Sequence, residues 1–239
     1  MDKELRNELR RNDLQESLQQ ARGFLTQSEV VKPALSVLAL FLVLGGLYYG
    51  QKYRASAAES AFARATEVFH ADVDPGATIP AGSLATFKTR GEKFEKAKSL
   101  FDAVAGSYSS MPAGKRARFY SALCLAQLGK TQEAEAALKP IAALRDPDSL
   151  EPALARVELA ELMLATGRAK DAVAAYQGLL ADAASGLPKD RLLFGLARSF
   201  AAAGDKLEAR RAYTDLVNRH PQSPFAQDSR QKMDALQTL

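Results

Sequence analysis

The feature that most constrains the fold of this chain is an uncharged, apolar stretch, residues 33–51, bounded by Lys32 and Lys52. At about 1.5 Å per residue, a helix of this length measures roughly 28 Å, which matches the hydrocarbon thickness of a bilayer. Tyr48 and Tyr49 lie near its end, and such rings favour the interface between lipid and water. The sequence therefore predicts a single transmembrane helix over residues 33–51, which anchors the chain in a lipid bilayer.

Two other interpretations of this stretch stay open. A buried core helix can be equally apolar, although core helices of this length usually carry one polar stripe. A cleaved signal peptide is the other alternative, because residues 55–57 (Ala-Ser-Ala) form a small-x-small pattern just beyond the apolar run. The 32 residues in front are long for a signal sequence, and Lys52 and Arg54 precede the pattern. An uncleaved anchor is therefore the favoured interpretation.

Residues 1–32 form an N-terminal tail with six basic and six acidic side chains. Its apolar residues recur at helical intervals, which indicates an amphipathic helix on a partner or on the membrane surface. A solvated tail without fixed structure explains the composition equally well. The apolar residues are Leu5, Leu9, Leu14, Leu18, Ala21 and Leu25. Basic residues flank the predicted span on both sides in similar numbers, so the positive-inside rule does not determine its orientation.

Charge, cysteine content and motif content argue against nucleic-acid binding, metal binding and catalysis. The formal net charge is +4, without a cluster of lysine and arginine, so nucleic acid is not an expected partner. Cys124 is the one cysteine, and His70 and His220 stand far apart, which excludes zinc sites of the usual ligand spacing. The sequence has no catalytic motif either. We therefore expect a non-enzymatic protein with no cofactor, no metal ion and no small-molecule substrate, in which Cys124 is a buried, inert thiol.

The chain after residue 87 repeats itself at intervals of 37 to 38 residues. Three segments share a glycine, an alanine five residues later and a large side chain four residues after the alanine. These residues are Gly129, Ala134 and Leu138, then Gly167, Ala172 and Tyr176, then Gly204, Ala209 and Tyr213. Ala97 and Phe101 continue the spacing and imply an earlier unit. A glycine that ends one helix in the left-handed conformation, followed by a small residue where the next helix approaches closely, explains the pattern.

This pattern predicts an all-α protein, in which an N-terminal transmembrane helix precedes an α-solenoid of about three to four helix pairs. We expect four regions along the chain. They are the tail 1–32, the transmembrane helix 33–51, a juxtamembrane helix with a Pro/Gly-rich loop over 52–86, and the repeat domain 87–239.

The spacing of small and bulky residues resembles the tetratricopeptide repeat (TPR). Pro221 falls where this family has its closing proline, whereas the usual tryptophan of the first helix is missing from every repeat. The resemblance implies that the first helices of the pairs line a groove for a peptide or helix of a partner protein. Carried onto this chain position by position, the groove residues are Arg116, Phe119, Leu123, Val157, Glu161, Leu164, Arg191, Phe194 and Arg198.

The predicted groove is apolar with a basic end. Phe119 and Leu123 occupy two places where cytosolic co-chaperone TPR domains carry the lysine and asparagine that clamp a C-terminal carboxylate. This argues against a receptor for chaperone tails and favours exposed hydrophobic segments of unfolded or translocating chains. For Phe119 and Phe194, packing in the core between repeats is an equally good interpretation.

The single N-terminal span, the degenerate repeats and the closing segment His-Pro-Gln-Ser-Pro-Phe-Ala at residues 220–226 are together similar to one family, the bacterial ancillary subunit of the Sec translocon. The resemblance implies an inner-membrane protein with a cytoplasmic N-terminus and a periplasmic repeat domain. Its implied partners are Sec translocon subunits, periplasmic chaperones or unfolded clients. The closing motif also occurs in outer-membrane assembly lipoproteins and cell-division coordinators, so a structural scaffold of another envelope complex, for secretion, pilus or outer-membrane assembly, is the alternative.

Overall fold

The computed structural model describes residues 31–76, 86–146 and 148–237, together with the single positions 19, 22, 78 and 83. Backbone contacts divide the chain into two units, Met1–Ser56 and Ala57–Leu239, and each is described by itself. The apolar positions of the amphipathic helix predicted in the N-terminal tail lie outside the described residues.

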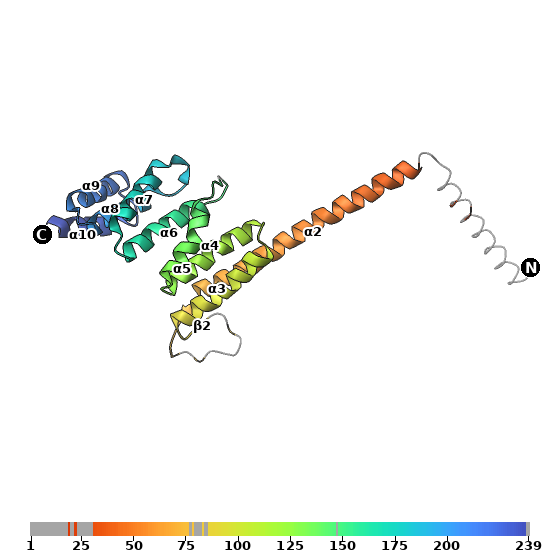
Figure 1. The fold of residues 1–239 in the computed structure, drawn as a ribbon, viewed down its shortest axis with the longest axis horizontal. Coiled ribbons are helices and arrows are strands. Elements are labelled where there is room, and N and C mark those ends of the chain that lie inside the picture. Colours follow the sequence, from red (N-terminus) through yellow and green to blue (C-terminus); the bar gives the residue numbers. More distant parts are fainter. Residues whose placement is uncertain are drawn as a thin grey trace, which may run out of the picture. The chain divides into compact units, whose positions relative to one another are not determined.

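The first unit contains the N-terminal part of helix α2, which begins at Val31 and ends at His70 (Figure 1). Within the described part of the chain, α2 is the one helix that is long and apolar enough to cross a membrane by its length and composition. Its large apolar side chains between Leu35 and Tyr53 are all at least 50% exposed. Water solvates such a surface poorly, because burial of apolar area is favourable by about 25 cal/mol per Å². The exposure fits the predicted lipid contact of residues 33–51 better than a place in a protein core.

The second unit is an α-solenoid, which confirms the predicted fold class. After α2 the chain forms a parallel bridge of two residues on each side, β1 (Asp72–Val73) and β2 (Thr86–Phe87). The helices then follow in sequence order (Figure 1): α3 (Arg90–Ser107), α4 (Pro112–Gln127), α5 (Thr131–Ala142), α6 (Glu151–Ala165), α7 (Ala169–Ala181), the short 3-10 helix η1 (Ala183–Ser185), α8 (Lys189–Ala202), α9 (Lys206–Arg219) and α10 (Ala226–Gln237).

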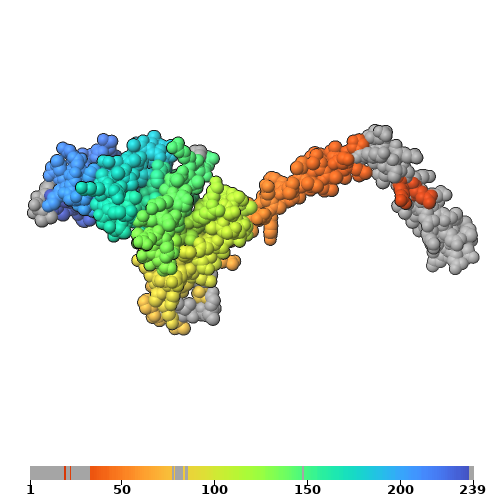
Figure 2. Space-filling model, viewed as in Figure 1, coloured from red at the N-terminus to blue at the C-terminus, as the bar shows by residue number. Residues whose placement is uncertain are grey.

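The helices pair in the way the repeat spacing predicts. Repeat 1 consists of the C-terminal part of α2 and of α3, and repeats 2, 3 and 4 are the pairs α4/α5, α6/α7 and α8/α9. The first helices of these three pairs (α4, α6 and α8) are called the A helices, and the second (α5, α7 and α9) the B helices. Consecutive helices from α3 to α10 pack against one another, and α4 also contacts α6, as α6 contacts α8. In the space-filling view the colours of this unit follow one another from yellow to blue in sequence order (Figure 2). Each repeat therefore touches mainly its neighbours in the sequence, as in other solenoids.

The three glycines of the repeat end the A helices. Gly129, Gly167 and Gly204 have φ angles of 73°, 76° and 85°, in the left-handed region that is costly for residues with a Cβ atom. Each glycine N–H donates to the carbonyl three residues before it, and the next N–H donates to the carbonyl five residues before it. These two hydrogen bonds form the Schellman motif, which satisfies carbonyls left unpaired at a helix end. The turn into each B helix is thus a local property of the sequence.

Small and large side chains interlock between the helices, as the sequence predicts. Ala134, Ala172 and Ala209 are fully buried, and so are the large residues four positions later. One further glycine makes this packing possible, because a Cβ atom on Gly195 would lie 2.3 Å from the ring of Tyr176. Cys124 is buried as well, and burial, with a smaller effect of Asp102, raises the pKa of its thiol to about 12. The predicted burial of Cys124 is therefore confirmed, and the raised pKa disfavours the reactive thiolate.

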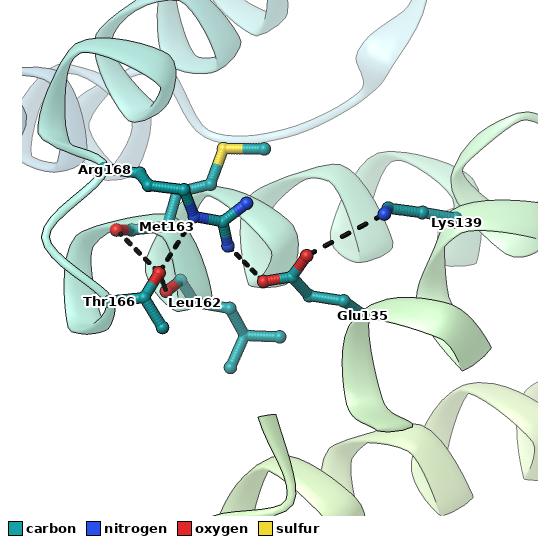
Figure 3. Close-up of polar contacts among 6 residues, drawn as sticks. All are labelled: Glu135, Lys139, Leu162, Met163, Thr166 and Arg168. Atoms are coloured by element: carbon teal, nitrogen blue, oxygen red, sulfur yellow. Dashed lines mark hydrogen bonds and ion pairs between the residues drawn. The ribbon is translucent and has the colours of Figure 1, made fainter. Parts of the chain in front are cut away.

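An ion pair joins repeats 2 and 3 on the B-helix side (Figure 3). The guanidinium of Arg168, in the turn before α7, pairs with the carboxylate of Glu135 on α5, whose other oxygen lies 3.8 Å from Nζ of Lys139. Nε of Arg168 donates to Oγ1 of Thr166 over 3.0 Å, and this hydroxyl in turn donates to the carbonyl of Leu162. The threonine thus orients the arginine, so the turn of one repeat is tied to the helix of the previous one.

Candidate protein-binding site

Three of the nine predicted groove residues are packing residues. Phe119 and Val157 are 4% and 2% exposed and belong to two hydrophobic clusters between repeats. Phe194 is partly buried against Tyr213 and stacks on Phe225, with ring centroids 4.9 Å apart and an angle of 20° between the rings. For both phenylalanines the structure therefore favours the core-packing interpretation, and we leave all three residues out of the proposed binding surface.

The closing motif of the chain explains the position of Phe194. In the turn between α9 and α10, Oγ of Ser223 donates to Oδ2 of Asp190 over 2.7 Å and accepts from the N–H of Phe225 over 3.1 Å. The hydroxyl thereby fixes the turn on the first residues of α8 and directs the ring of Phe225 onto Phe194. The closing segment, residues 220–226, acts here as a cap that covers apolar side chains of repeat 4.

The three predicted arginines form ion pairs between the first helices of neighbouring repeats. Nη2 of Arg116 lies 2.5 Å from Oε2 of Glu59 on α2. Two arginines of α8 reach back to α6, Arg191 to Glu158 over 3.9 Å and Arg198 to Glu161 over 3.1 Å. These arginines therefore hold the first helices of adjacent repeats together as well as carrying charge.

The two ends of this row of ion pairs expose opposite charges. In repeats 3 and 4 the arginines are the more exposed partners, since the side chain of Arg198 is 41% and that of Glu161 33% exposed. In repeats 1 and 2 the order is reversed, with Glu59 53% and Arg116 34% exposed. The more exposed charges on α6 and α8 are therefore cations, at the end where the sequence predicts a basic groove.

The remaining predicted residues are two leucines, which are half-buried. Leu123 packs against the cluster between repeats 2 and 3, and Leu164 against the cluster between repeats 3 and 4. Each leaves part of its side chain accessible. They are the predicted residues that can offer apolar surface to a partner.

One cavity brings three of the nine residues together. Glu161, Leu164 and Arg198 line a cavity of about 420 Å³. The other lining residues are small or lie on the C-terminal helices: Ala165, Ala201, Ala202, Tyr213 and Lys232. The cavity is therefore lined by small apolar side chains and by charged groups, which suits a side chain from a partner protein.

The carboxylates of α6 differ in their surroundings. Burial raises the pKa of Glu158, and nearby Glu161 raises it further against the opposing effect of Arg191. Glu161 accepts a hydrogen bond from the hydroxyl of Tyr176 over 2.6 Å and two from Arg198 over 3.1 and 3.2 Å. The Glu161 carboxylate is thus bonded within the protein, which favours a structural role over acid-base chemistry.

Sequence reasoning missed several residues of this surface. Tyr213 is one of the large residues of the repeat spacing, yet it also lines the cavity, and Lys232 comes from α10, outside the repeat pattern. Sequence reasoning also gave no weight to the linker between α5 and α6, where Leu144 and Leu150 are more than half exposed and a second cavity of about 390 Å³ opens. Two leucines in a short linker were the available signal for this second surface. Among the described residues no group of His, Cys, Asp or Glu side chains is arranged to hold a metal ion.

These features define a helical-repeat protein whose exposed surfaces suit binding to other proteins. The family model of the tetratricopeptide repeat-like domain matches residues 32–238, so the chain belongs to this family. No curated protein matches the sequence. Two solved structures are similar in fold. They are the TPR-like repeats of a Podospora anserina protein described as a kinesin light chain, and a variant of the same repeats with one substitution.

Both structures are 20% identical to this chain and cover 62% of it. The match extends over 79% of the first structure with a TM-score of 0.51, and over 78% of the variant with a TM-score of 0.52. At this identity the similarity establishes the fold alone. A TPR-like domain of this kind is a protein-protein interaction module.

Proposed function

We propose that this chain is a membrane-anchored interaction module that assists protein translocation or periplasmic chaperone activity at the Sec translocon of the bacterial inner membrane. The predicted span over residues 33–51 anchors it, with the N-terminus in the cytoplasm and the repeat domain in the periplasm. The observation that carries the proposal is the cavity of about 420 Å³ on α6 and α8, within a TPR-like domain that follows an apolar helix.

The chemistry of the binding surface supports a role in holding polypeptide segments. Leu164 and the small residues around the cavity offer apolar contact, and Arg198 adds a donor for backbone or side-chain acceptors. Extended chains present alternating apolar and polar groups, and both kinds can be satisfied on such a surface. A protein beside the translocon that binds emerging segments in this way would keep them from aggregating.

Site-specific photocrosslinking tests the binding surface. A photoreactive amino acid at Ala202, an exposed position that lines the cavity, should crosslink to emerging or unfolded polypeptides in cells. The same group at Gln177, an exposed position on the B helix α7, is the matched control and should give few crosslinks. Equal crosslinking at both positions would contradict the assignment of the surface to α6 and α8.

Co-purification tests the location of the module. Translocon subunits should purify with the full-length chain in a mild detergent, and a reporter fused after the last residue should be active only outside the cytoplasm. A reporter active only in the cytoplasm would overturn the proposed orientation and, with it, the proposed role at the Sec translocon.

The alternative is a structural scaffold for another cell-envelope complex in secretion, pilus or outer-membrane assembly. The observation that favours it is the second surface at the α5–α6 linker, since exposed leucines beside a cavity are typical of stable subunit contacts. A scaffold should purify with a fixed set of envelope subunits, without translocon subunits and without crosslinks to unfolded chains from position 202.

A further inference from the structure

Repeats 3 and 4 carry the same large residue at the same position but differ in its partner. Tyr176 on α7 and Tyr213 on α9 lie 37 residues apart, and both are buried. The A-helix position that faces Tyr176 is Glu161, and the position 37 residues later is Arg198. A carboxylate in one repeat is therefore replaced by a guanidinium in the next.

In repeat 3 the carboxylate is held by a phenol and a cation. The hydroxyl of Tyr176 donates to Oε1 of Glu161 over 2.6 Å, and Nη1 of Arg198 donates to both oxygens over 3.1 and 3.2 Å. A phenol and a guanidinium that converge on one carboxylate form a charge-assisted arrangement, which is stronger than a hydrogen bond between neutral groups.

In repeat 4 the corresponding groups surround a cavity. Tyr213 and Arg198 line the cavity of about 420 Å³, and Lys232 of α10 adds a second cation. Glu161 is the one carboxylate in this lining, and it is already bonded to Tyr176 and Arg198. The lining thus includes two cations and one anion that is already engaged.

The acidic residue of α10 that pairs with Lys232 does not line the cavity. Oδ1 of Asp228 lies 3.8 Å from Nζ of Lys232, and both side chains are about half exposed. Asp228 is not among the residues that line the cavity. A contact of this length on one exposed helix face is weak, so an incoming anion can compete for the lysine.

We propose that this cavity binds an aspartate or glutamate side chain of a partner protein, whose carboxylate lies between Lys232, Arg198 and the hydroxyl of Tyr213. The bound group would occupy in repeat 4 the role that Glu161 has in repeat 3. This inference deepens the proposed function, on which it rests, by naming the residue type that the module selects.

The surroundings define which acidic segments fit. The apolar part of the lining consists of Leu164, Ala165, Ala201 and Ala202, so a small or aliphatic residue next to the acidic one gains apolar contact. The phenol of Tyr213 stays protonated, because burial, with a further contribution of Asp228, raises its pKa to about 12. It can therefore donate a hydrogen bond at physiological pH.

Binding of synthetic peptides to the full-length chain in detergent tests the proposal. The probe is a fluorescein-labelled peptide of alternating alanine and leucine with one central glutamate and an amidated C-terminus, measured by fluorescence anisotropy. The matched peptides carry glutamine or lysine at the centre, and a fourth carries glutamine with a free C-terminal carboxylate. The glutamate peptide should bind about tenfold more tightly than the glutamine peptide, as one charge-assisted contact requires, and the lysine peptide more weakly still.

Variants of two residues that line the cavity, Lys232 and Tyr213, test whether this preference arises there. Lys232→Glu should abolish the preference for glutamate, and Tyr213→Phe should reduce it about threefold or more, since one hydrogen bond is lost. Lys170→Glu, a charge reversal at an exposed position of α7, is the matched control and should leave the preference unchanged. Circular dichroism checks that each variant is folded, and Lys232 lies on the surface of the last helix, where a substitution disturbs little packing.

Each outcome has a defined meaning. Equal binding of the glutamate and glutamine peptides, or no binding of the glutamate peptide, overturns the proposal, and so does an undiminished preference in Lys232→Glu. Tighter binding of the free C-terminal carboxylate than of the glutamate side chain would also overturn it, because the site would then select chain ends. If the peptide assay fails but crosslinking from position 202 persists in Lys232→Glu, the acidic-residue site is overturned and the proposed function stands.

Discussion

Repeats 3 and 4 have corresponding helices, turns and tyrosines. The tyrosine of repeat 3 is hydrogen-bonded to a carboxylate, whereas the tyrosine of repeat 4 lines a cavity. In repeat 3, Tyr176 and Arg198 satisfy Glu161, and Gly195 leaves room for the ring. In repeat 4, Tyr213 lines the cavity together with Arg198 and Lys232. The difference follows from one change of charge on the A helix. In a solenoid, where each repeat packs mainly against its neighbours, such a change at the end of the array leaves a group without its usual partner.

The largest effect is expected when repeat 3 is broken by Gly195→Ala. The new Cβ atom would lie 2.3 Å from the ring of Tyr176, so the buried ring must move and lose its contact with Glu161. We expect a loss of about 1–3 kcal/mol in the free energy of unfolding, as for overpacked cores, measured by urea denaturation of the full-length chain in detergent. Gly178→Ala, on an open helix face, is the control and should be neutral or stabilising. Equal stability of the two variants would contradict the packing described for repeat 3.

Removing each tyrosine hydroxyl sharpens the comparison of the two repeats. Tyr176→Phe leaves Glu161 without its phenol partner while Arg198 still pairs with it, so we expect a loss of about 1–2 kcal/mol in the free energy of unfolding. Tyr213→Phe should cost less than about 0.5 kcal/mol, because its side chain lines a cavity and does not hold a carboxylate as Tyr176 does. Denaturant unfolding of both variants gives the two values. A larger loss for Tyr213→Phe would mean that the hydroxyl of Tyr213 also has a partner within the protein.

A smaller effect is expected from Ser223→Ala, which weakens the cap of repeat 4. The hydroxyl of Ser223 is the main cause that lowers the pKa of Asp190, and its loss should cost about 0.5–1 kcal/mol of unfolding free energy at neutral pH. A lowered pKa contributes stability that is present above the ordinary aspartate pKa and is lost as the pH falls through the folded value. The variant should therefore lose less stability than the wild type on acidification. Parallel pH profiles of the midpoint of thermal unfolding would contradict this.

The smallest effect is expected from Glu158→Gln. Burial raises the pKa of Glu158 above its ordinary value, so the folded protein binds a proton more readily than the unfolded chain. Stability contributed by this group therefore falls as the pH rises from the ordinary glutamate value through the raised folded value. The variant lacks this term, so its midpoint of thermal unfolding relative to wild type should rise between acidic and neutral pH. A constant difference in this midpoint over that pH range would contradict the burial of the Glu158 carboxylate.

The site was less predictable than the fold, and Phe194 shows why. The position of Phe194 in the sequence fits a groove residue and a core residue equally well, because both kinds of residue lie on the same side of an A helix. The ring of Phe225, 31 residues further along the chain, covers it. Whether the position is open thus depends on a turn fixed by Ser223 and Asp190, a contact between distant segments that helical periodicity does not encode.

The sequence by itself determined the backbone plan of this protein. The spacing of glycine and alanine defines where helices end and where they approach closely, because left-handed φ angles and short interhelical distances restrict the residue at each position. The apolar stretch 33–51 likewise predicts a membrane anchor from length and composition. Only the tertiary structure decided which side chains are accessible, since Phe119 and Val157 are covered while Lys232 is exposed at a cavity that Tyr213 also lines. Accessibility is decided by side chains from different helices, and these come together only when the repeats stack.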